Sequence, residues 1–531
     1  MKKTLLMLVA FMATMTAFAQ EEPEGWEKSF TPVTDAKKLA GVNTAVASDG
    51  SVYVSSTYDQ AFTFAEKSVT DPEGLLSSCV LKYDKDGNEL WSVSFVGACT
   101  INAMAADSDG TLYVVGRSQD FSVTCTGTDG QSKIIEAPTK EVWGDIVVAA
   151  YPAFIAKISK EGVFEAIKTI TPSTDEIIAN ATGEVWGEIM NLYPSWNTPM
   201  ILPNNIQIDG DKVYVSALYM GDVKELNWEG GYIFSEDMGM YDDLYSAGVF
   251  SLEKSNLSDP ANVAFVGDIP DTERTDGATS LLYEVDDLNF YAENGISYVF
   301  FVGKGKLRIV SPAGTEEFTD WSYNSALDGI EHPLVCATIT SSLTTKVFRV
   351  NPHENESLHL YKILTGEIID GNIILGGNFY GNFWFKEDLT TNQTTSFVAS
   401  IKLSDSSVQW ATPNTVASEA TCMIVTGEEI KASTDAATYT IKTATGEVKT
   451  DMTMNKSFAD ADVYNDEYVS TVTTDGASVV VFSPKMSPSG IEAIKAAAAK
   501  GEMKIFNLNG QRVAKPQKGL YIINGTKVAI K

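Results

Sequence analysis

Short apolar runs interrupted by Asp-Gly turns recur along the chain. The clearest copy, residues 105–116 (AADSDGTLYVVG), reads as a strand, a tight turn and a second strand; further copies are 47–55 (ASDGSVYVS), 207–216 (QIDGDKVYVS) and 368–377 (IIDGNIILGG). Asp and Gly accept the positive φ that tight hairpin turns demand, and Val, Tyr and Ile suit a pleated sheet, so each copy predicts a β-hairpin. A hairpin repeated at intervals of tens of residues indicates a repeat architecture.

Further strand-like runs follow the hairpins in the sequence. The first is followed by residues 79–83 (CVLKY), a DKDG turn and residues 89–95 (ELWSVSF). Echoes of that third strand occur at 154–158, 249–252, 347–350, 397–401, 438–442 and 479–482. Seven four-stranded units therefore fit the chain, and small antiparallel sheets repeated in this way pack radially as a β-propeller.

Alternatives to this all-β, seven-bladed fold are six or eight blades, a β-solenoid, or a string of sandwiches. Solenoid repeats are shorter and more even, and sandwiches do not repeat a hairpin motif. The weakest stretch is 303–342, which we interpret as a long insertion in the fourth unit, with an eighth unit as the alternative.

The DSDGTLYVVG hairpin and the KYDKDGNELW strand pair resemble exported seven-bladed β-propeller proteins of the SBBP-like type. The resemblance spans the repeats and implies a fold and export. Propellers carry many unrelated functions, so it implies no activity.

Both ends of the chain differ from the repeats. Residues 1–19 contain two lysines, an apolar run and the small-residue site Ala17-Phe18-Ala19, which predicts an export signal peptide rather than a structural helix. We therefore expect the propeller, residues 20–483, in the periplasm, on the outer surface or outside the cell. No later apolar run approaches the roughly 18 residues of a membrane helix, so no transmembrane segment is predicted.

After residue 483 the chain becomes an Ala/Lys-rich linker, 484–503, and then a tail, 504–531. The tail resembles the C-terminal β-sorting domains of type IX secretion, through NLNGQRV at 507–513, GLYI at 519–522 and the terminal residues 527–531. The resemblance implies sorting or anchoring; the alternative is a β-unit of two or three strands that turns at Asn524-Gly525.

The composition of the chain argues against some classes of binding partner. The chain has 531 residues, of which 70 are acidic and 39 basic, for a net charge of −31. Such a balance repels nucleic acid and anionic membranes, so neither is an expected partner. The five cysteines lack any metal-ligand spacing and mostly lie in apolar strand-like runs, which predicts burial.

The sequence shows no clear motif for a catalytic or metal-binding site. The three histidines, His332, His353 and His359, are interpreted as solvated loop residues, and no GxSxG, HExxH or P-loop motif occurs. The acidic turns at 84–88 and 107–110 lack the third Asp and distal Glu of a calcium loop. No cofactor is predicted, and calcium is disfavoured. A glycosidase-like carboxylate pair cannot be chosen from sequence, because its separation is unknown.

One constellation suggests a binding surface. The segment EVWGDI followed by Tyr-Pro recurs as EVWGEI followed by Tyr-Pro, outside the predicted strands. Exposed aromatic rings beside carboxylates suit protein or glycan recognition, whereas caps on the sheet ends are the alternative. The candidate binding residues are Trp143, Asp145, Tyr151, Trp186, Glu188, Tyr193 and Trp196.

Blade topology places these residues together. With strands a to d, the a-b and c-d turns share one face of the disk, and the b-c and d-a connections share the other. The long segments, 57–76, 118–152, 171–203 and 219–246, are all b-c or d-a connections. We therefore predict one aromatic-acidic patch over blades two and three.

Two functions remain open at this point. The favoured one is an exported or cell-surface propeller that binds a protein or glycan through its long loops. The alternative is a polysaccharide-active hydrolase or lyase that uses axial carboxylates. Carboxylates converging in a deep axial pocket would favour the enzyme.

A final prediction concerns closure of the ring. Trp26–Phe30 repeats the W-x-x-S-F pattern of residues 91–95, although no hairpin precedes it, and the last unit lacks an outer strand. We expect Trp26–Phe30 to pair beside residues 479–482 and to remove the open edge.

Overall fold

The computed structural model describes most of the repeat region and short parts of the C-terminal tail. The described residues are 25–34, 38–142, 146–173, 200–229, 245–268, 284–304, 307–318, 334–348, 350–351, 360–384, 388–412, 419–435, 437–453, 458–464, 467–474, 476–483, 505–507, 519–523 and 526–530. Residues 27–483 form one compact unit, and residues 1–26 and 484–531 are grouped as a second. No helix within the described ranges is long and apolar enough to cross a membrane.

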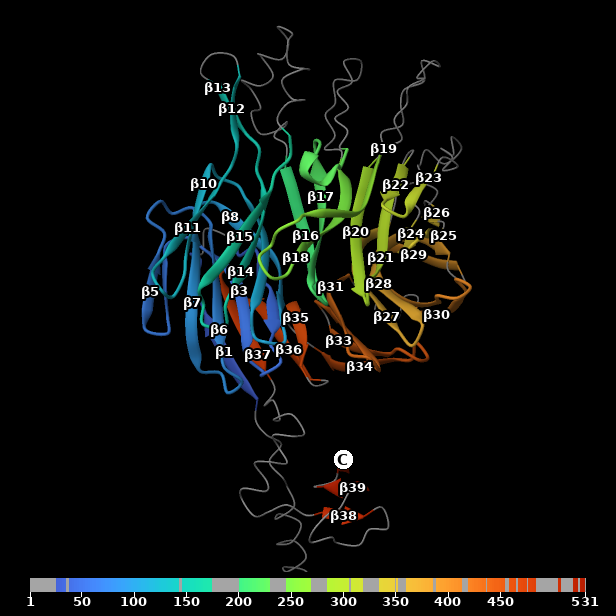
Figure 1. The fold of residues 1–531 in the computed structure, drawn as a ribbon. Helices are drawn as coiled ribbons and strands as arrows, with labels where there is room; N and C mark the ends of the chain where they lie inside the picture. Colours follow the sequence, from blue (N-terminus) through green and yellow to red (C-terminus); the bar gives the residue numbers. More distant parts are fainter. Residues whose placement is uncertain are drawn as a thin grey trace, which may run out of the picture. The chain divides into compact units, whose positions relative to one another are not determined.

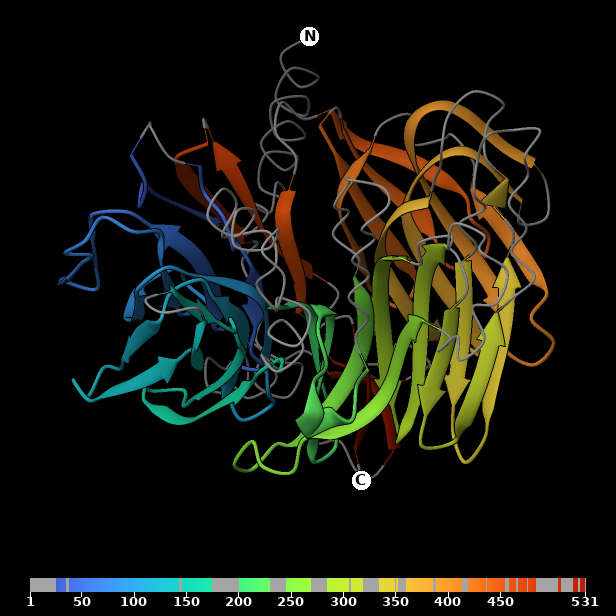
Figure 2. The same ribbon diagram turned by 90° about the horizontal axis from the view of Figure 1, so that it is seen from above.

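The repeat region is a seven-bladed β-propeller (Figures 1 and 2). From the axis outward, the strands of blade 1 are β2 (Thr44–Val46), β3 (Val52–Tyr58), β6 (Ser77–Tyr83) and β7 (Glu89–Val96). Those of blade 2 are β8 (Cys99–Ala106), β9 (Leu112–Ser118), β14 (Ala153–Ile158) and β15 (Phe164–Ile170). Those of blade 3 are β16 (Met200–Asp209), β17 (Lys212–Met220), β18 (Ser246–Glu253) and β19 (Ala261–Asp268).

The remaining blades follow the same order. Those of blade 4 are β20 (Glu284–Glu293), β21 (Ile296–Lys304), β24 (Leu334–Ile339) and β25 (Leu343–Phe348). Those of blade 5 are β27 (Leu360–Ile369), β28 (Asn372–Trp384), β29 (Asp388–Lys402) and β30 (Val408–Thr412), with β26 (Val350–Asn351) beside the far end of β28. Those of blade 6 are β31 (Ala420–Val425), β32 (Glu429–Thr434), β33 (Ala437–Lys442) and β34 (Val448–Thr453).

Blade 7 closes the ring with the two ends of the repeat region. Its strands β35 (Phe458–Tyr464), β36 (Glu467–Thr474) and β37 (Ser478–Ser483) are completed by β1 (Trp26–Phe30), which pairs with β37. Next to this pairing, the hydroxyls of Thr31 and Ser478 lie 2.7 Å apart. The predicted closure is confirmed.

The stretch 303–342 holds no eighth blade among its described residues. Residues 307–318 form the hairpin β22 (Leu307–Ser311) and β23 (Gly314–Phe318), and β24 is the third strand of blade 4. The prediction of a third strand at 347–350 was therefore wrong, because residues 347–348 end the outer strand β25. The third strand is instead β24, a nearly continuous buried apolar run (LVCATI), whereas most of β25 alternates half-buried and exposed residues.

Two hairpins join neighbouring blades. The hairpin β10 (Ser122–Thr126) and β11 (Ser132–Glu136) lies in the b-c connection of blade 2, yet β10 pairs with β7, the outer strand of blade 1. In the same way, β22 and β23 lie in the b-c connection of blade 4 and extend blade 3 through β19. Each of these straps, as we call the two hairpins, fastens a blade to the preceding one.

The tight turns explain the repeated Asp-Gly motif. Gly50 and Gly110 have φ of 84° and 85°, whereas the preceding Asp residues do not have positive φ. Instead, the carboxylate of Asp109 accepts a 2.8 Å hydrogen bond from the Thr111 N–H, and Asp49 accepts one from Ser51. The Asp side chain thus closes the turn that the Gly backbone allows.

The hydrophobic core lies between successive blades. Its clusters each combine side chains from two neighbouring sheets, for example Phe95 of blade 1 with Phe154 of blade 2, whose rings are 5.5 Å apart. All five cysteines are free and buried, which confirms their predicted structural role.

Smaller elements complete the described chain. They are the hairpin β4 (Ala61–Phe64) and β5 (Lys67–Thr70), the hairpin β12 (Thr139–Val142) and β13 (Ile146–Ala149), and the 3-10 turn η1 (Lys224–Leu226). Within the tail, β38 (Ile505–Asn507), β39 (Gly519–Ile523) and β40 (Thr526–Ile530) form a three-stranded sheet.

Candidate functional site: the axial cavity

The seven inner strands surround a cavity of about 690 Å³ on the propeller axis. Figure 2 shows the blades arranged around this axis. Each of β2, β8, β16, β20, β27, β31 and β35 contributes side chains to its wall. Clefts and cavities of roughly 300–1,000 Å³ suit small ligands.

A recurring β-bulge shapes the wall. The register of the inner strand against its neighbour shifts by one residue once in blades 2, 3, 4, 6 and 7, and twice in blade 5. An extra residue at a bulge bends the strand and re-aims its side chain. In blades 2, 3 and 6 the extra residues are Asn102, Asn204 and Thr421, and all three line the cavity.

Two of these bulge side chains bind the next blade. Asn204 donates a 2.6 Å hydrogen bond to the Leu288 carbonyl of blade 4, and Thr421 donates one of 2.8 Å to the Phe458 carbonyl of blade 7. Asn102 occupies the equivalent place in blade 2, but its Oδ1 is buried without a hydrogen-bond partner in the described part of the chain. One buried acceptor behind the wall is therefore left unpaired among the described residues.

The seam between blades 7 and 1 is joined by carboxylates. Asp460 accepts a 2.6 Å hydrogen bond from the Thr44 N–H, and Asp462 accepts one of 2.7 Å from the Val46 N–H. The two Asp residues are two apart on β35, so their side chains share one face of the strand. This seam brings two negative charges to the cavity wall.

Charge on the wall is confined to one sector. The lining residues of blades 1 to 3 are uncharged, whereas blades 4, 5 and 7 carry every charged lining residue. These residues are Asp287, Lys362, Glu367, Asp460 and Asp462. Four carboxylates thus share the wall with one lysine.

Burial perturbs three of these carboxylates. It raises the pKa of Asp460 to about 7 and that of Asp462 to about 6, although backbone N–H donors to both oppose the shift. Burial, with a smaller contribution from the charge of Asp462, raises the pKa of Glu367 to about 7. Glu367 receives no hydrogen bond from the described residues, and a carboxylate in such a position takes up a proton easily.

Most of the aromatic-acidic patch predicted from sequence lies outside the described residues: Trp143, Asp145, Trp186, Glu188, Tyr193 and Trp196. Tyr151 is described. It is half-buried at the end of the b-c connection of blade 2, where it forms an isolated bridge with Met200 of β16. The proximity of the two tryptophan segments stays a prediction, and His332, His353, His359 and the signal peptide also lie outside the described residues.

The connections differ between the two faces as predicted for the first blades. The a-b turns at Asp49-Gly50, Asp109-Gly110 and Gly210-Asp211 are tight, whereas the b-c connections of blades 1, 2 and 4 hold whole hairpins. Hairpin β12–β13 extends from the upper face in Figure 1. That face carries the additions, while the opposite face carries short turns.

The described Trp in one of these connections caps a sheet. Trp228 follows η1 and is 1% exposed, with its ring against Tyr219 and Phe250. A Cβ on Gly248 would lie 2.5 Å from this ring, so the glycine makes room for it. An aromatic residue in a long connection can therefore serve packing alone.

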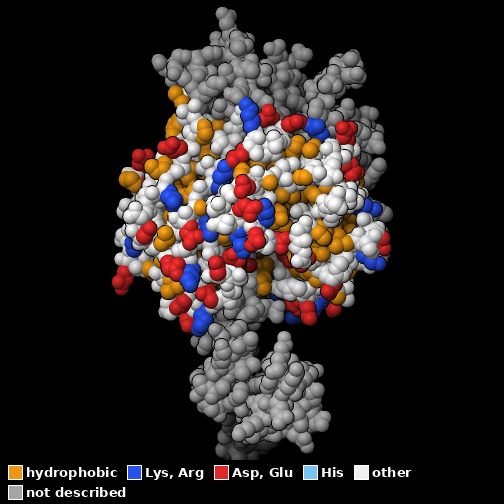
Figure 3. Space-filling model, viewed as in Figure 1, with side chains coloured by type: hydrophobic (Ala, Val, Ile, Leu, Met, Phe, Trp, Pro, Cys, Tyr) orange, Lys and Arg blue, Asp and Glu red, His pale blue; other side chains and the backbone are white. Residues whose placement is uncertain are grey.

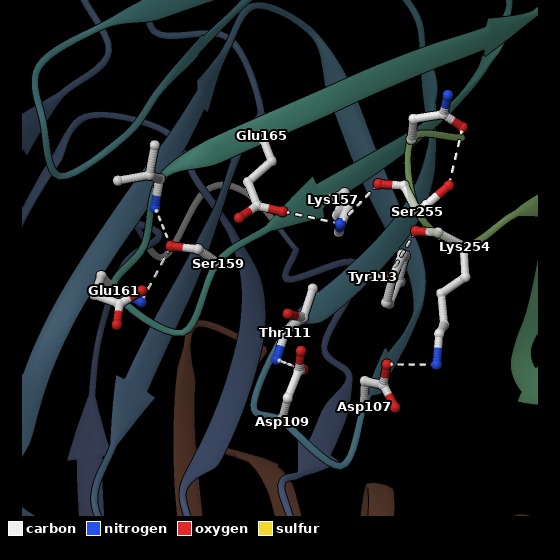
Figure 4. A network of polar contacts seen from close by, with 12 residues as sticks. Asp107, Asp109, Thr111, Tyr113, Lys157, Ser159, Glu161, Glu165, Lys254 and Ser255 are labelled. Carbon is white, nitrogen blue, oxygen red and sulfur yellow. Dashed lines mark hydrogen bonds and ion pairs between the residues drawn. The ribbon is translucent and has the colours of Figure 1, made fainter. Parts of the chain in front are cut away.

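The seam between blades 2 and 3 is tied at the opposite face (Figure 4). The Tyr113 hydroxyl donates a 2.9 Å hydrogen bond to the Lys254 carbonyl, and the Lys254 ammonium lies 2.9 Å from the Asp107 carboxylate. Lys157 reaches both the Ser255 carbonyl and Glu165. Tyr53 makes the equivalent bond from blade 1 to the Gly110 carbonyl, which explains the Tyr that follows each of these Asp-Gly turns.

The acidic side chain that begins the turn at 84–88 accepts hydrogen bonds from within the same turn. The carboxylate of Asp84 accepts hydrogen bonds from the backbone of Asp86 and from the backbone and side chain of Asn88. No group of three or more potential metal ligands occurs within the described ranges. On the side shown in Figure 3, acidic and basic side chains are interspersed, so the net charge forms no single acidic patch there.

Sequence reading missed the cavity residues. Asp460 and Asp462 had a signal, since FADADVY places two acids at alternate positions of an inner strand. Asn102 and Glu367 had none, because a bulge and a blade seam decide where they point.

Topology and cavity together define a repeat protein of the β-propeller class. No protein-family model matches the sequence, and no curated protein is similar to it. Among solved structures, the Dos1 propeller is similar over 87% of this chain and 95% of its own, with 9% identity and a TM-score of 0.41.

Two further propellers show the same remote likeness. BamB from Moraxella catarrhalis matches 81% of this chain and 98% of its own, with 11% identity and a TM-score of 0.35. The quinohemoprotein alcohol dehydrogenase from Comamonas testosteroni matches 87% and 76%, with 12% identity and a TM-score of 0.39. Likeness at this level carries no argument about function.

Proposed function

We propose that this propeller is an exported or cell-surface binding protein that recognises a protein or glycan through the face carrying its b-c and d-a connections. One observation carries the proposal: whole hairpins are inserted on that face, while the Asp-Gly turns of the other face stay tight. Extended segments on a rigid scaffold are a common place for recognition.

The signal-like residues 1–19 and the sorting-like tail support export and surface attachment as parts of this proposal. The candidate contact residues are those of the aromatic-acidic patch, with Trp143 and Trp186 as its central aromatic side chains. Tryptophan and tyrosine commonly dominate binding surfaces because they bring rigid apolar area with a polar edge.

The test is a glycan array combined with a pull-down on the mature protein and on Trp143→Ala/Trp186→Ala. We expect a loss of ligand capture of about a hundredfold with little loss of thermal stability. Lys85→Ala/Asp86→Ala, on the tight-turn face, is the matched control and should retain capture. If the Trp variant instead unfolds at a much lower temperature, the rings are caps like Trp228 and the proposal fails.

A polysaccharide-active enzyme is the second candidate, favoured by the axial carboxylates. Glu367, with its pKa raised to about 7, suits a general acid, and Asp462 is a neighbouring carboxylate. Release of reducing ends from a panel of polysaccharides, abolished by Glu367→Gln, would establish this activity. If reducing ends are released from neither neutral nor acidic polysaccharides, the enzymatic candidate is rejected.

A further inference from the structure

The outer strand of the first strap, β11, has an open edge. Among the described strands only β10 pairs with it. Just beyond one end of this ladder, the Ala137 N–H donates a 2.9 Å hydrogen bond to the Phe121 carbonyl. In an antiparallel ladder, pairs that exchange hydrogen bonds alternate with pairs that do not. Counting from Ala137, the backbone groups of Glu136, Ile134 and Ser132 therefore point away from β10, and they have no hydrogen-bond partner within the described ranges.

Blade 2 packs against the inner face of this strap and leaves its edge open. Ile135 of β11 and Phe164 of β15 belong to the same buried cluster, and the two strands are not paired. On the outer face, Ile134 is 59% exposed, the largest exposed fraction of any large apolar side chain in the described part of the chain. An unpaired strand edge with an apolar residue at its centre is a site for pairing with another strand.

The sequence of β11 suits an antiparallel pair with a second copy of itself. When a two-fold axis passes beside Ile134, this residue lies opposite its own copy, and Ser132 lies opposite Glu136 of the second chain. The outward backbone groups then form hydrogen bonds in register, and the two isoleucine side chains cover each other. A serine faces each carboxylate, so no like charges stand directly opposite.

The second strap lacks this self-complementarity. Its outer strand β23, with the sequence GTEEF, has Glu316 at its centre, and Glu316 accepts a 2.6 Å hydrogen bond from the Thr345 hydroxyl of blade 4. A two-fold pair of β23 strands would place Glu316 opposite its own copy, and like charges directly opposite destabilise a sheet. Of the two straps, only the first therefore has an edge that fits a second copy.

We propose that two copies of this chain associate through their β11 strands, which pair antiparallel about Ile134 and join the two extended sheets into one. β11 belongs to a b-c connection, so the dimer would present two of the proposed recognition faces together. Its formation requires neither a ligand nor the aromatic-acidic patch. Two five-residue strands bury much less than the roughly 1,200–2,000 Å² of a stable interface. We therefore expect a weak dimer, with a Kd of about 10–100 µM.

Sedimentation equilibrium of the mature protein between about 5 and about 500 µM tests the proposal. We expect a monomer at the low end, a dimer at the high end and no larger species, because a two-fold pair of edges closes on itself. Raising the salt concentration should strengthen the dimer, since salt screens the repulsion between two chains of net charge −31.

Two substitutions at Ile134 should weaken the dimer by about tenfold or more. Ile134→Pro removes the outward N–H that the second copy needs, and an edge strand tolerates proline where the N–H would face solvent. Ile134→Lys places two positive charges directly opposite each other, and it carries the test if the proline variant does not fold. The matched control is Leu90→Lys, at an apolar residue of β7 that is 46% exposed, and it should change the Kd by less than about twofold.

Cysteine cross-linking tests the register. The five native cysteines are buried, so a cysteine introduced at an exposed position of β11 is the more accessible to an oxidant. In the proposed pair the two Ile134 Cα atoms are about 5.5 Å apart, within the roughly 4.4–6.8 Å of a disulfide. The two Lys133 positions are diagonal neighbours at about 7–8 Å. With copper–phenanthroline, Ile134→Cys should form a covalent dimer and Lys133→Cys should not.

The proposal fails if the protein stays monomeric at about 500 µM, and a strand of another protein is then the remaining occupant of this edge. It also fails if Leu90→Lys weakens the dimer as much as Ile134→Lys, or if both cysteine variants cross-link equally, as random collision would produce. Trp143→Ala/Trp186→Ala should still dimerise, so ligand capture by that variant tests the proposed function separately.

Discussion

The seams on the two sides of blade 1 are joined by different chemistry. Towards blade 2, the Trp91 indole and the Lys82 ammonium donate hydrogen bonds of 2.9 and 3.0 Å to the Lys160 carbonyl, and a strap extends the sheet. Towards blade 7, Asp460 and Asp462 accept hydrogen bonds from blade 1 backbone. One seam directs donors to a carbonyl, and the other directs carboxylates to N–H groups.

The difference shows how one repeat gives an asymmetric cavity. Carbonyl-directed ties leave no charge on the wall, so the side of blades 1 to 3 is neutral. The Asp460 and Asp462 side chains join the other seam through hydrogen bonds but leave negative charge facing the axis, in a place where burial raises their pKa. The same contacts that close the ring thus also give this side of the cavity wall its negative charge.

Removing β1 should break the closed seam most severely. Deletion of residues 21–32 exposes the edge of β37 and removes about five backbone hydrogen bonds, each worth roughly 1 kcal/mol. We expect the midpoint of thermal unfolding to fall by about 10 °C. Deletion of residues 21–25 is the control, and a melt that is the same for both deletions would contradict closure by this strand.

The strap at the other seam can be tested with two adjacent isoleucines. Ile135 of β11 is fully buried against the core between blades 1 and 2, whereas Ile134 is 59% exposed. Ile135→Ala should lower the free energy of unfolding by about 2–5 kcal/mol in urea titrations, and Ile134→Ala by less than about 0.5 kcal/mol. Equal effects would mean that the strap adds nothing to the seam.

The carboxylate seam should respond to pH. Folding raises the pKa of Asp462 from its ordinary value to about 6, so the folded state binds a proton that the unfolded state has released. Stability therefore falls as pH rises from about 4 to about 6, and it is lowest above that window. A neutral amide in place of the carboxylate has no such dependence.

Asp462→Asn should consequently be more stable than the parent at pH 8 by about 1 kcal/mol, since it still accepts the Val46 hydrogen bond. At pH 4, where the carboxyl group is protonated in the folded state, the difference should nearly vanish. Chemical unfolding at both values of pH measures it. A variant less stable at pH 8 would show that the ionised carboxylate, rather than its shape, holds the seam.

The local sequence pattern predicted the blades but not the contacts between neighbouring blades. The Asp-Gly turns, the Val/Tyr-rich strands and the orphan Trp26–Phe30 predicted seven blades and their closure, because each depends on residues close in sequence or on a repeated motif. The straps pair strands across a blade boundary, and no residue in SVTCT, the sequence of β10, indicates that its partner is β7. The cavity residues depend on bulges, so Asn102 could not be distinguished from an ordinary strand residue.

The smallest expected effect compares the same tyrosine bond at a strapped and an unstrapped seam. Tyr53→Phe removes the bond to the Gly110 carbonyl between blades 1 and 2, and Tyr113→Phe removes the bond to the Lys254 carbonyl between blades 2 and 3. Each substitution should cost about 1 kcal/mol of global stability.

Hydrogen exchange should distinguish the two variants, because the local opening of each turn depends on which other contacts hold it. The turn after β18 should exchange several-fold faster in Tyr113→Phe, where the Lys254 and Lys157 contacts in Figure 4 still tie it to blade 2 but no strap crosses the seam. The turn after β8 should change little in Tyr53→Phe, because the strap still joins blade 1 to the chain of blade 2. Equal exchange at the two turns would show that the strap does not reinforce its seam, and that the difference between the seams of this propeller is confined to charge.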